Sequence, residues 1–263
     1  MPPSSAPLLI DLAESFPHLS RAPISEAVFQ IRGRALASWE EAAILPTLKA
    51  SLPDYPKAES SRTQQITVGG KEGPVAPVVD LGWSGAVLRS PDGRQVANFQ
   101  RDSFTLSRLA PYQNWETFSS EAFRLYDIHL NLAQPAEAQR IGLRFINQFD
   151  APSDSFDLGD IFIQPPPAAQ TALQLSRARF FHQDTYSVPD FPYFITVTRT
   201  LQPAAHTPIA RINPKLILDI DVFTNEPFSA NLTQVRARLE EMRWLKNKIF
   251  FGSLTPTVIA SFR

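Results

Sequence analysis

The chain has 263 residues, of which 43% are hydrophobic and 11% aromatic, enough for a substantial core in one large or two ordinary domains. Its formal net charge of −1 disfavours binding to nucleic acid or anionic lipid over the whole surface. Binding through a local charged patch is compatible with this net charge. It has no cysteine, which excludes disulfides, a thiolate nucleophile and a cysteine-ligated zinc site.

Residues 1–24 are expected to form an N-terminal arm that contains proline and serine. No basic residue precedes the short apolar run 8–10, and Asp11 follows it, so the segment makes a poor signal peptide. No apolar run approaches the roughly 20 residues that a membrane helix needs. We therefore expect a soluble, cytoplasmic protein that does not associate with membranes.

Residues 25–150 are expected to form a first α+β half. Apolar residues alternate with polar ones in 25–34, and further strands are predicted near 63–68 and 78–89. The sequence Ser-Pro-Asp-Gly at 90–93 is a turn that folds the last of these strands back onto residues 95–109. The alternation changes phase within that return strand, which predicts a bulge or small turn at 101–103. A strand over residues 140–149 closes the half.

Two helices are predicted in the same half. Residues 38–41 form a capping box that opens the first helix, which Pro46 kinks or restarts. Asn114 caps the second helix, which ends before Pro135. His129 lies in the apolar stripe of that helix, and we expect it to be a packed histidine with one satisfied ring nitrogen.

Residues 151–171 lack sustained periodicity and include three consecutive prolines, so they are predicted to be a linker. Residues 172–263 are expected to form a second half, with strand-like runs near 173–187, 193–201 and 209–223 followed by a C-terminal helix. Strands followed by a long amphipathic helix thus occur twice along the chain.

The C-terminal helix has the strongest local signals. Asn231 and Gln234 form a capping-box start, apolar residues then recur every three or four positions, and Gly252 followed by Pro256 marks a stop. The apolar stripe needs a surface to cover, and antiparallel sheet is what the rest of the chain offers. The predicted fold is α+β, with antiparallel sheet covered by long amphipathic helices, in two related halves or a helix-grip arrangement.

Four stretches, at residues 25–32, 142–147, 218–223 and 245–255, resemble a family of sporadically distributed bacterial proteins of similar length and unknown function. The resemblance supplies no activity, cofactor or catalytic residue. The patchy distribution of that family implies accessory cellular roles, such as defence or toxin-linked systems.

Asp219 and Asp221 are two residues apart on a predicted strand, so both carboxylates face the same side. This arrangement suits a Mg²⁺- or Mn²⁺-dependent nuclease or phosphotransfer enzyme. A salt-bridged strand face opposite buried residues explains the same pattern. A metal needs a further ligand, and His182 and Asp184 on a meander would lie two strands away, about 9–10 Å, which is too far.

Three arginines form a second candidate site on strand faces. Arg32, Arg140 and Arg144 suit bidentate binding of phosphate or carboxylate, and Arg32 and Arg144 would converge in an anion or nucleotide sensor if the first and fifth strands were neighbours. The alternative is that these arginines pair internally with acidic residues, namely Glu26, Asp219 and Asp221. In that case the aspartates are not available to a metal and the arginines are not available to an anion, so neither candidate site exists.

The C-terminal helix also carries a basic face that is interrupted by two glutamates. Binding to a nucleic-acid backbone is one interpretation, and a solvated helix surface is the one we favour. The residues are Arg236, Arg238, Arg243, Lys246 and Lys248.

Aromatic residues are dense between positions 180 and 194, beside Pro189 and Pro192. Some of them must belong to the core, yet so many rings also suit a partner-binding surface, for which the candidates are Phe180, Phe181, Tyr186, Phe191 and Tyr193. Recognised enzymatic motifs are missing from the sequence. We therefore expect a non-enzymatic protein-binding or regulatory module without a cofactor, with the metal-dependent enzyme and the anion sensor as alternatives.

Overall fold

The computed structural model describes residues 7–65, 79–151, 156–168, 177–202, 205–206, 211–212 and 214–263. The strands of its main sheet are β1 (Ile24–Arg32), β2 (Lys57–Gln65), β3 (Val79–Arg89), β4 (Gln95–Gln100), β5 (Ser103–Leu109), β6 (Arg140–Asp150), β7 (Phe180–Ser187), β8 (Phe194–Gln202) and β11 (Lys215–Thr224). A separate two-stranded ribbon consists of β9 (Ala205–His206) and β10 (Arg211–Ile212). The helices are α1 (Glu41–Ser51), α2 (Trp115–Ala133), α3 (Leu232–Ser253), the short α4 (Pro256–Ala260) and the 3₁₀ turn η1 (Leu158–Asp160).

The main sheet has nine strands in the order β2-β3-β4-β5-β1-β6-β11-β8-β7, and every neighbouring pair is antiparallel. The predicted α+β class with antiparallel sheet is therefore confirmed. The strand β6 joins the two sides of the sheet, because it pairs with β1 at one edge and with β11 at the other. The sheet is thus continuous across both predicted halves.

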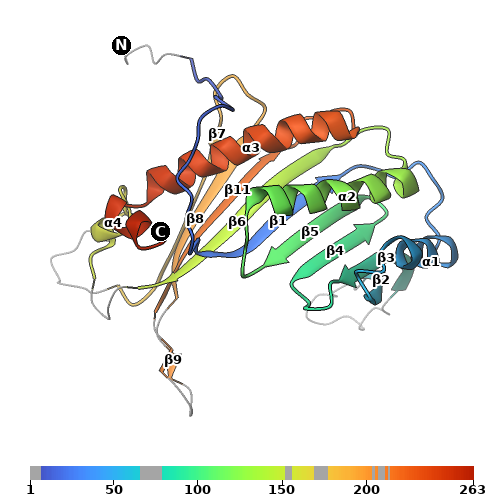
Figure 1. Cartoon of the computed structure of the whole chain (residues 1–263), viewed down its shortest axis with the longest axis horizontal. Helices are drawn as coiled ribbons and strands as arrows, with labels where there is room; N and C mark the ends of the chain where they lie inside the picture. Colours follow the sequence, from blue (N-terminus) through green and yellow to red (C-terminus); the bar gives the residue numbers. More distant parts are fainter. Residues whose placement is uncertain are drawn as a thin grey trace, which may run out of the picture.

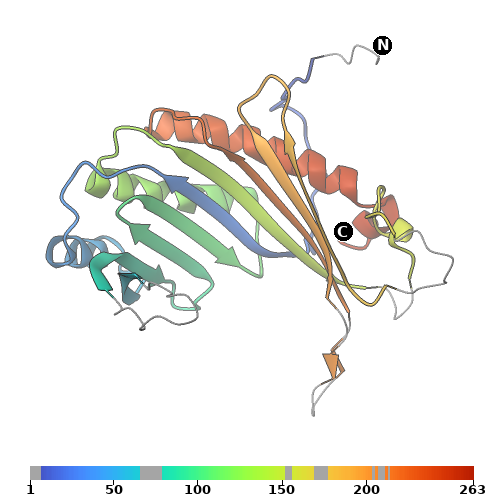
Figure 2. The same cartoon turned by 180° about the vertical axis from the view of Figure 1, so that it is seen from behind.

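The long helices α2 and α3 lie on the same face of the sheet, and Figure 2 shows the other face from behind, where no drawn helix covers the strands. Period-two alternation explains this division. The side chains of Phe29, Leu143 and Leu218 on the helix side have no exposed surface, whereas Arg144 and Asp219 lie on the open side. One hydrophobic core fills the layer between sheet and helices (Figure 1).

Side-chain caps fix the starts of both long helices, as predicted. The Asn114 side chain accepts a hydrogen bond from the Thr117 amide at 2.8 Å, and that of Asn231 accepts one from the Gln234 amide at 2.9 Å. The helix α2 ends at Ala133, before Pro135. The helix α3 continues through the predicted stop and ends one residue later.

Other local predictions need correction. The predicted capping box at 38–41 does not form, because α1 begins only at Glu41 and its N-cap residue makes no side-chain hydrogen bond. Pro46 lies inside α1, which continues to Ser51. By contrast, the bulge or small turn predicted at 101–103 is confirmed as a turn at residues 101–102, which divides the predicted return strand 95–109 into β4 and β5.

Two strands predicted near the limits of the described residues differ in extent from the prediction. The strand predicted at 63–68 is β2, which begins earlier, and its predicted end lies outside the described residues. The strand predicted at 173–187 begins at Phe180, and part of its predicted start also lies outside the described residues. Within the predicted linker 151–171, Ile161 and Phe162 are buried, and Phe162 forms a β-bridge with Leu254. The described part of this segment therefore packs on the core.

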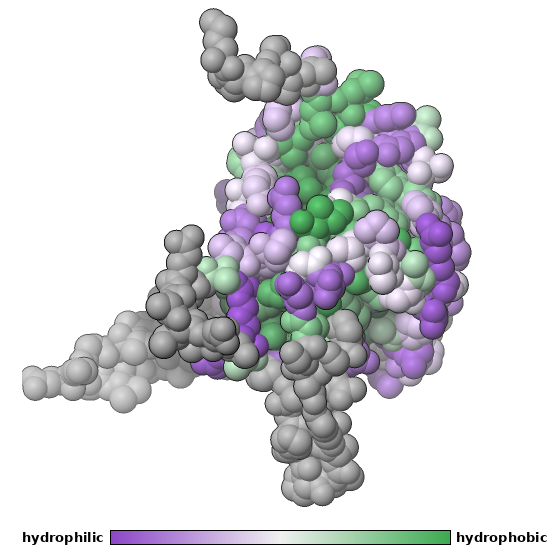
Figure 3. Space-filling view, turned by 90° about the vertical axis from the view of Figure 1, so that its left-hand side faces the viewer, coloured by the Kyte–Doolittle hydropathy of each residue, from purple (hydrophilic) through white to green (hydrophobic). Residues whose placement is uncertain are grey.

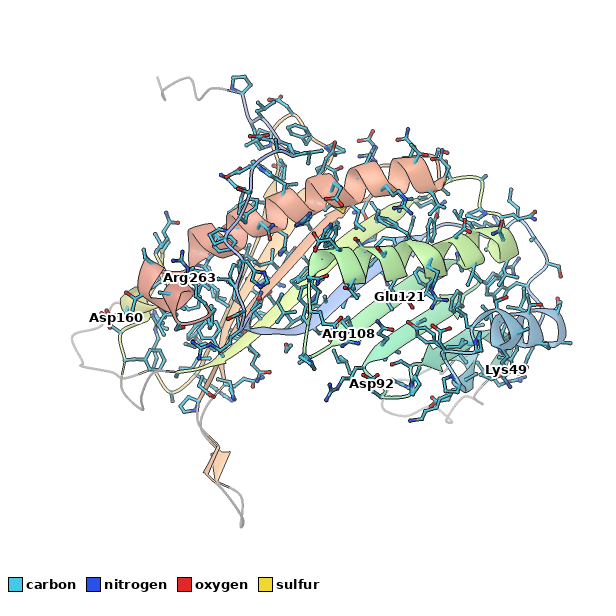
Figure 4. The ribbon with its side chains drawn as sticks, viewed as in Figure 1. Lys49, Asp92, Arg108, Glu121, Asp160 and Arg263 are labelled. Atoms are coloured by element: carbon cyan, nitrogen blue, oxygen red, sulfur yellow. The ribbon has the colours of Figure 1, made fainter. Side chains whose placement is uncertain are left out.

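The first helix is attached to α2 by a polar network. The hydroxyl of Tyr55 donates to Glu121 Oε1 at 2.7 Å, and Arg124 Nη2 donates to Asp54 Oδ2 at 2.6 Å. Figure 4 shows Glu121 on α2, on the side of Arg108 in β5 and of Asp92 in the turn between β3 and β4. Since Tyr55 follows α1 directly, these contacts fix the end of α1 against α2.

None of the helices in the described ranges combines the length and apolar character that crossing a bilayer requires.

Candidate functional site

The open face of the sheet carries an ion-pair network that joins the two predicted charge sites. Arg144 binds Asp219 in bidentate fashion, with Nε–Oδ1 and Nη2–Oδ2 distances of 2.8 and 2.5 Å. Arg140 Nη2 lies 3.4 Å from Asp221 Oδ2, and its Nη1 donates to Gln30 at 2.9 Å. The arginines and aspartates therefore pair with one another, as the internal-pairing alternative predicted.

Partial burial affects these charges. Burial raises the pKa of Asp221, although the nearby guanidinium of Arg140 opposes this shift. Burial lowers the pKa of Arg140, whose guanidinium carbon lies 4.9 Å from the ring centroid of Phe223. The hydrogen bonds of Asp219 raise the pKa of Arg144. A pocket of about 320 Å³ opens beside this network.

Arg32 does not join Arg144 in an anion site. The strands β1 and β6 are neighbours, which was the condition for convergence, but the register places Arg32 opposite Arg140 and Val28 opposite Arg144. Arg32 is four residues from Val28, the residue opposite Arg144, which is roughly 13 Å along an extended strand at 3.3 Å per residue. The pair Arg32 and Arg144 is therefore too widely spaced to grip one small anion.

Among the residues that the structure describes, no third metal ligand lies beside Asp219 and Asp221. His182 and Asp184 are on β7, two strands from β11, as predicted. The register also puts them on the helix-side face, because His182 lies opposite Arg199, which in turn lies opposite the buried Leu218. Across the described ranges, no group of three or more histidine, cysteine, aspartate or glutamate side chains is arranged to hold a metal ion.

The aromatic group around β7 divides between surface and core. Phe181 is 69% exposed and Tyr186 is 49% exposed. Phe180 and Phe191 are half-buried against the core. Tyr193, predicted with this group as a partner-binding residue, is instead a core residue whose hydroxyl donates to Glu241.

His129 behaves as predicted. Its Nε2 lies 3.0 Å from the carbonyl oxygen of Gln100, its Nδ1 has no hydrogen-bond partner, and the side chain is buried among aromatic rings. Burial lowers the pKa of His129 to about 4, so the ring is neutral at physiological pH.

The basic face of α3 is partly solvated, since Arg236 and Lys248 are exposed and the other three cations are half-buried. All five lie over aromatic rings. The distances from the charged group to the ring centroid are 4.0 Å for Arg236 over Phe123, 4.8 Å for Arg238 over Phe228, 5.1 Å for Arg243 over Trp115, 4.2 Å for Lys246 over Phe145 and 5.4 Å for Lys248 over Trp244.

Two of these cations, Arg243 and Lys246, line a pocket of about 240 Å³ that sequence reasoning missed. The N-terminal arm, the start of α2, the strand β6 and the helix α3 supply its walls, and Lys246 is among its lining residues. Burial lowers the pKa of Lys246 to about 7. Figure 3 shows the end of the molecule near α4, where hydrophobic residues are exposed between hydrophilic ones.

Comparison with protein-family models and with curated proteins finds no match to this chain.

Proposed function

We propose that this chain is a non-enzymatic module that binds another protein through the outer edge of β7. The observation that carries the proposal is the exposure of Phe181 and Tyr186 on this edge strand, which pairs with β8 on one side and with no described strand on the other. An edge strand presents unpaired backbone N–H and C=O groups. An extended peptide segment of the partner adds there as a further strand, and Phe181 and Tyr186 contact its side chains on the two faces.

The opposite edge of the sheet is less suited to this role. Its strand β2 is rich in polar and charged residues, and Glu59 Oε1 lies 3.8 Å from Arg89 Nε. Charged side chains on an edge strand oppose pairing with another chain. By contrast, the large aromatic side chains of β7 resemble the anchors that supply most binding energy at protein interfaces.

The ion-pair network favours this function over a metal-dependent enzyme. A divalent cation at Asp219 would have to displace two hydrogen bonds from Arg144. Thermal unfolding in Mg²⁺ or Mn²⁺ discriminates the two functions. We expect no stabilisation of the wild type beyond that of the Asp219→Ala variant, whereas metal-dependent stabilisation lost in Asp219→Ala would favour the enzyme.

The binding surface is tested by affinity capture from an extract of the native host. We expect a stoichiometric partner that binds the wild type and is lost from the double variant Phe181→Asp/Tyr186→Asp. The matched control is the double variant Leu9→Asp/Leu12→Asp, which places the same two charges at apolar positions of the arm that are 76% and 59% exposed. On complex formation, the backbone amides of β7 should gain protection from hydrogen exchange. A partner that binds the double variant equally well, without protection of β7, contradicts the proposal.

We further propose that the sheet consists of two related halves that meet at the β1–β6 pair. The first half contains β1 beside this junction, a four-strand meander of β2 to β5 and then the long helix α2, and the second contains β6, a three-strand meander of β7, β8 and β11 and then the long helix α3. A long helix across an antiparallel sheet in each half is a helix-grip-like arrangement. This division supports a junction at residues 134–139, between α2 and β6. From the resemblance of its four stretches to the bacterial family, we also propose that the chain has an accessory role in a defence or toxin-linked system.

A further inference from the structure

The pocket that contains Lys246 is closed on one side by the N-terminal arm. Glu14 accepts hydrogen bonds from Trp244 Nε1 at 2.8 Å and from Lys248 Nζ at 2.9 Å. Phe16 stacks on Phe251 with 5.6 Å between ring centroids. These contacts hold the arm across α3, where the dark blue segment crosses the helix in Figure 1.

Lys246 is the unmatched charge of this pocket. Its Nζ lies 4.2 Å from the ring centroid of Phe145, and it makes no hydrogen bond or salt bridge within the described part of the chain. Lys248, two residues later, is paired with Glu14. Lys246 is half-buried, and partly withdrawing a cation from water without a counter-charge costs free energy, which an anionic ligand would offset.

The other charged groups at the pocket are already matched. Arg243 lies 3.7 Å from Glu116 and 3.4 Å from Glu240, so its charge is shared between two carboxylates. His18 and the phenol of Tyr112 also line the pocket, and burial raises the pKa of Tyr112. The pocket therefore offers one available ammonium group rather than a cluster of cations.

The remaining lining is aromatic and amide-rich, with Tyr112, Trp115 and Phe250 beside Gln113 and Asn247. Its volume of about 240 Å³ is below the roughly 300–1,000 Å³ typical of drug-sized ligands. A single ammonium matches a monovalent carboxylate better than a phosphate, which usually takes arginine forks or several backbone N–H donors. The aromatic rings of the lining would contact an apolar part of the ligand.

We propose that this pocket binds a small carboxylate with an apolar body, and that the carboxylate pairs with Lys246. The site is separate from the β7 edge, so it is a second binding function in addition to the proposed protein interface.

The proposal has a pH signature with a defined sign. The pKa of Lys246 is about 7 in the empty pocket, and a bound carboxylate raises it, so binding takes up a proton above about pH 7. Affinity should be level below about pH 7 and then fall by up to about tenfold per pH unit until the raised pKa is reached.

The test is a calorimetric or NMR titration of the full chain with phenylacetate and with the neutral analogue phenylacetamide. At about pH 6 we expect saturable binding of phenylacetate at least about tenfold tighter than that of phenylacetamide, and loss of this preference at about pH 9. The affinity of phenylacetamide should not change with pH. Inorganic phosphate should bind more weakly than phenylacetate.

The variant Lys246→Met should lose at least about tenfold in phenylacetate affinity. The control Lys49→Met removes an exposed lysine from the distant α1 and should bind as the wild type does (Figure 4). Circular dichroism confirms that both variants fold. Absence of saturable phenylacetate binding, an affinity independent of pH, or full affinity in Lys246→Met overturns the proposal. None of these results alters the capture experiment on β7, so the two proposals fail separately.

Discussion

At the scale of single residues, His129 is a buried group that couples folding to pH. Its pKa is about 4 in the folded chain and about 6.5 when unfolded, so between these values the unfolded chain binds the proton that the folded chain excludes. The stability from the neutral ring is fully present above about pH 6.5 and is lost as pH falls towards 4, by up to about 3 kcal/mol. Urea unfolding across this range measures the loss.

The variant His129→Phe should flatten this pH dependence, because phenylalanine fills the aromatic pocket without a titrating nitrogen. The variant His18→Gln removes an exposed histidine and should leave the dependence unchanged. An unchanged slope in His129→Phe would assign the acid sensitivity to other groups.

Lys246 couples folding to pH in a different window. Its pKa is about 7 when folded and about 10.4 when unfolded, so the folded chain binds fewer protons between these values and stability rises with pH through them. Below about pH 7 the charged lysine is destabilising.

The variant Lys246→Met should therefore unfold at a higher temperature than the wild type at about pH 6, with a smaller difference at about pH 10. Differential scanning calorimetry at both pH values checks this, and a variant less stable than the wild type at pH 6 would contradict it.

At the scale of elements, α3 is held by its apolar stripe rather than by its charged residues. Leu239 has no exposed surface, so Leu239→Ala should lower the free energy of unfolding by about 2 to 5 kcal/mol through lost burial and a cavity. Leu9→Ala makes the same chemical change at a position that is 76% exposed and should cost less than about 0.5 kcal/mol. Urea unfolding gives both values, and equal costs would refute the assignment of the stripe to the core.

The sequence predicted the elements whose signals are local. The starts of α2 and α3 were predictable because Asn114 and Asn231 cap the amides three residues later along the chain. The change of alternation marked the β4–β5 turn because side-chain direction alternates strictly along a strand. The capping box at 38–41 failed because the N-cap of α1 is Glu40, two residues after the predicted Ser38, while the Trp39 side chain donates a hydrogen bond to the distant Ser84 carbonyl.

Features that depend on distant contacts could not be predicted in this way. Lys246 looked like one more solvated cation on a helix face, and only the arm, over 200 residues earlier in the chain, turns its surroundings into a pocket. The pairing of Arg144 with Asp219 could be anticipated, since charges on adjacent strand faces tend to cancel. The register that separates Arg32 from Arg144 is a non-local property, and neither strand carries a local signal for it.

At the scale of the whole molecule, the continuous sheet makes the two halves depend on each other. The strand β6 pairs with β1 on one side and with β11 on the other, so β1 and β6 are both interior strands of the sheet. Separating the halves would break the β1–β6 pair and leave both strands with an unpaired edge. The core residues of both halves also form one cluster beneath α2 and α3. Two related halves are therefore compatible with a single folding unit.

This continuity predicts one cooperative unfolding transition. Leu88 in β3 and Leu218 in β11 lie on opposite sides of the junction, and neither has exposed surface. Each Leu→Ala variant should lower stability by about 2 to 5 kcal/mol and shift one common transition, because loss of packing on either side destabilises the whole sheet. Far-UV circular dichroism and the fluorescence of tryptophans, which lie on both sides of the junction, should report the same urea midpoint in each variant. If Leu218→Ala moved only part of the signal and left a second transition at the wild-type midpoint, the halves would be independent folding units.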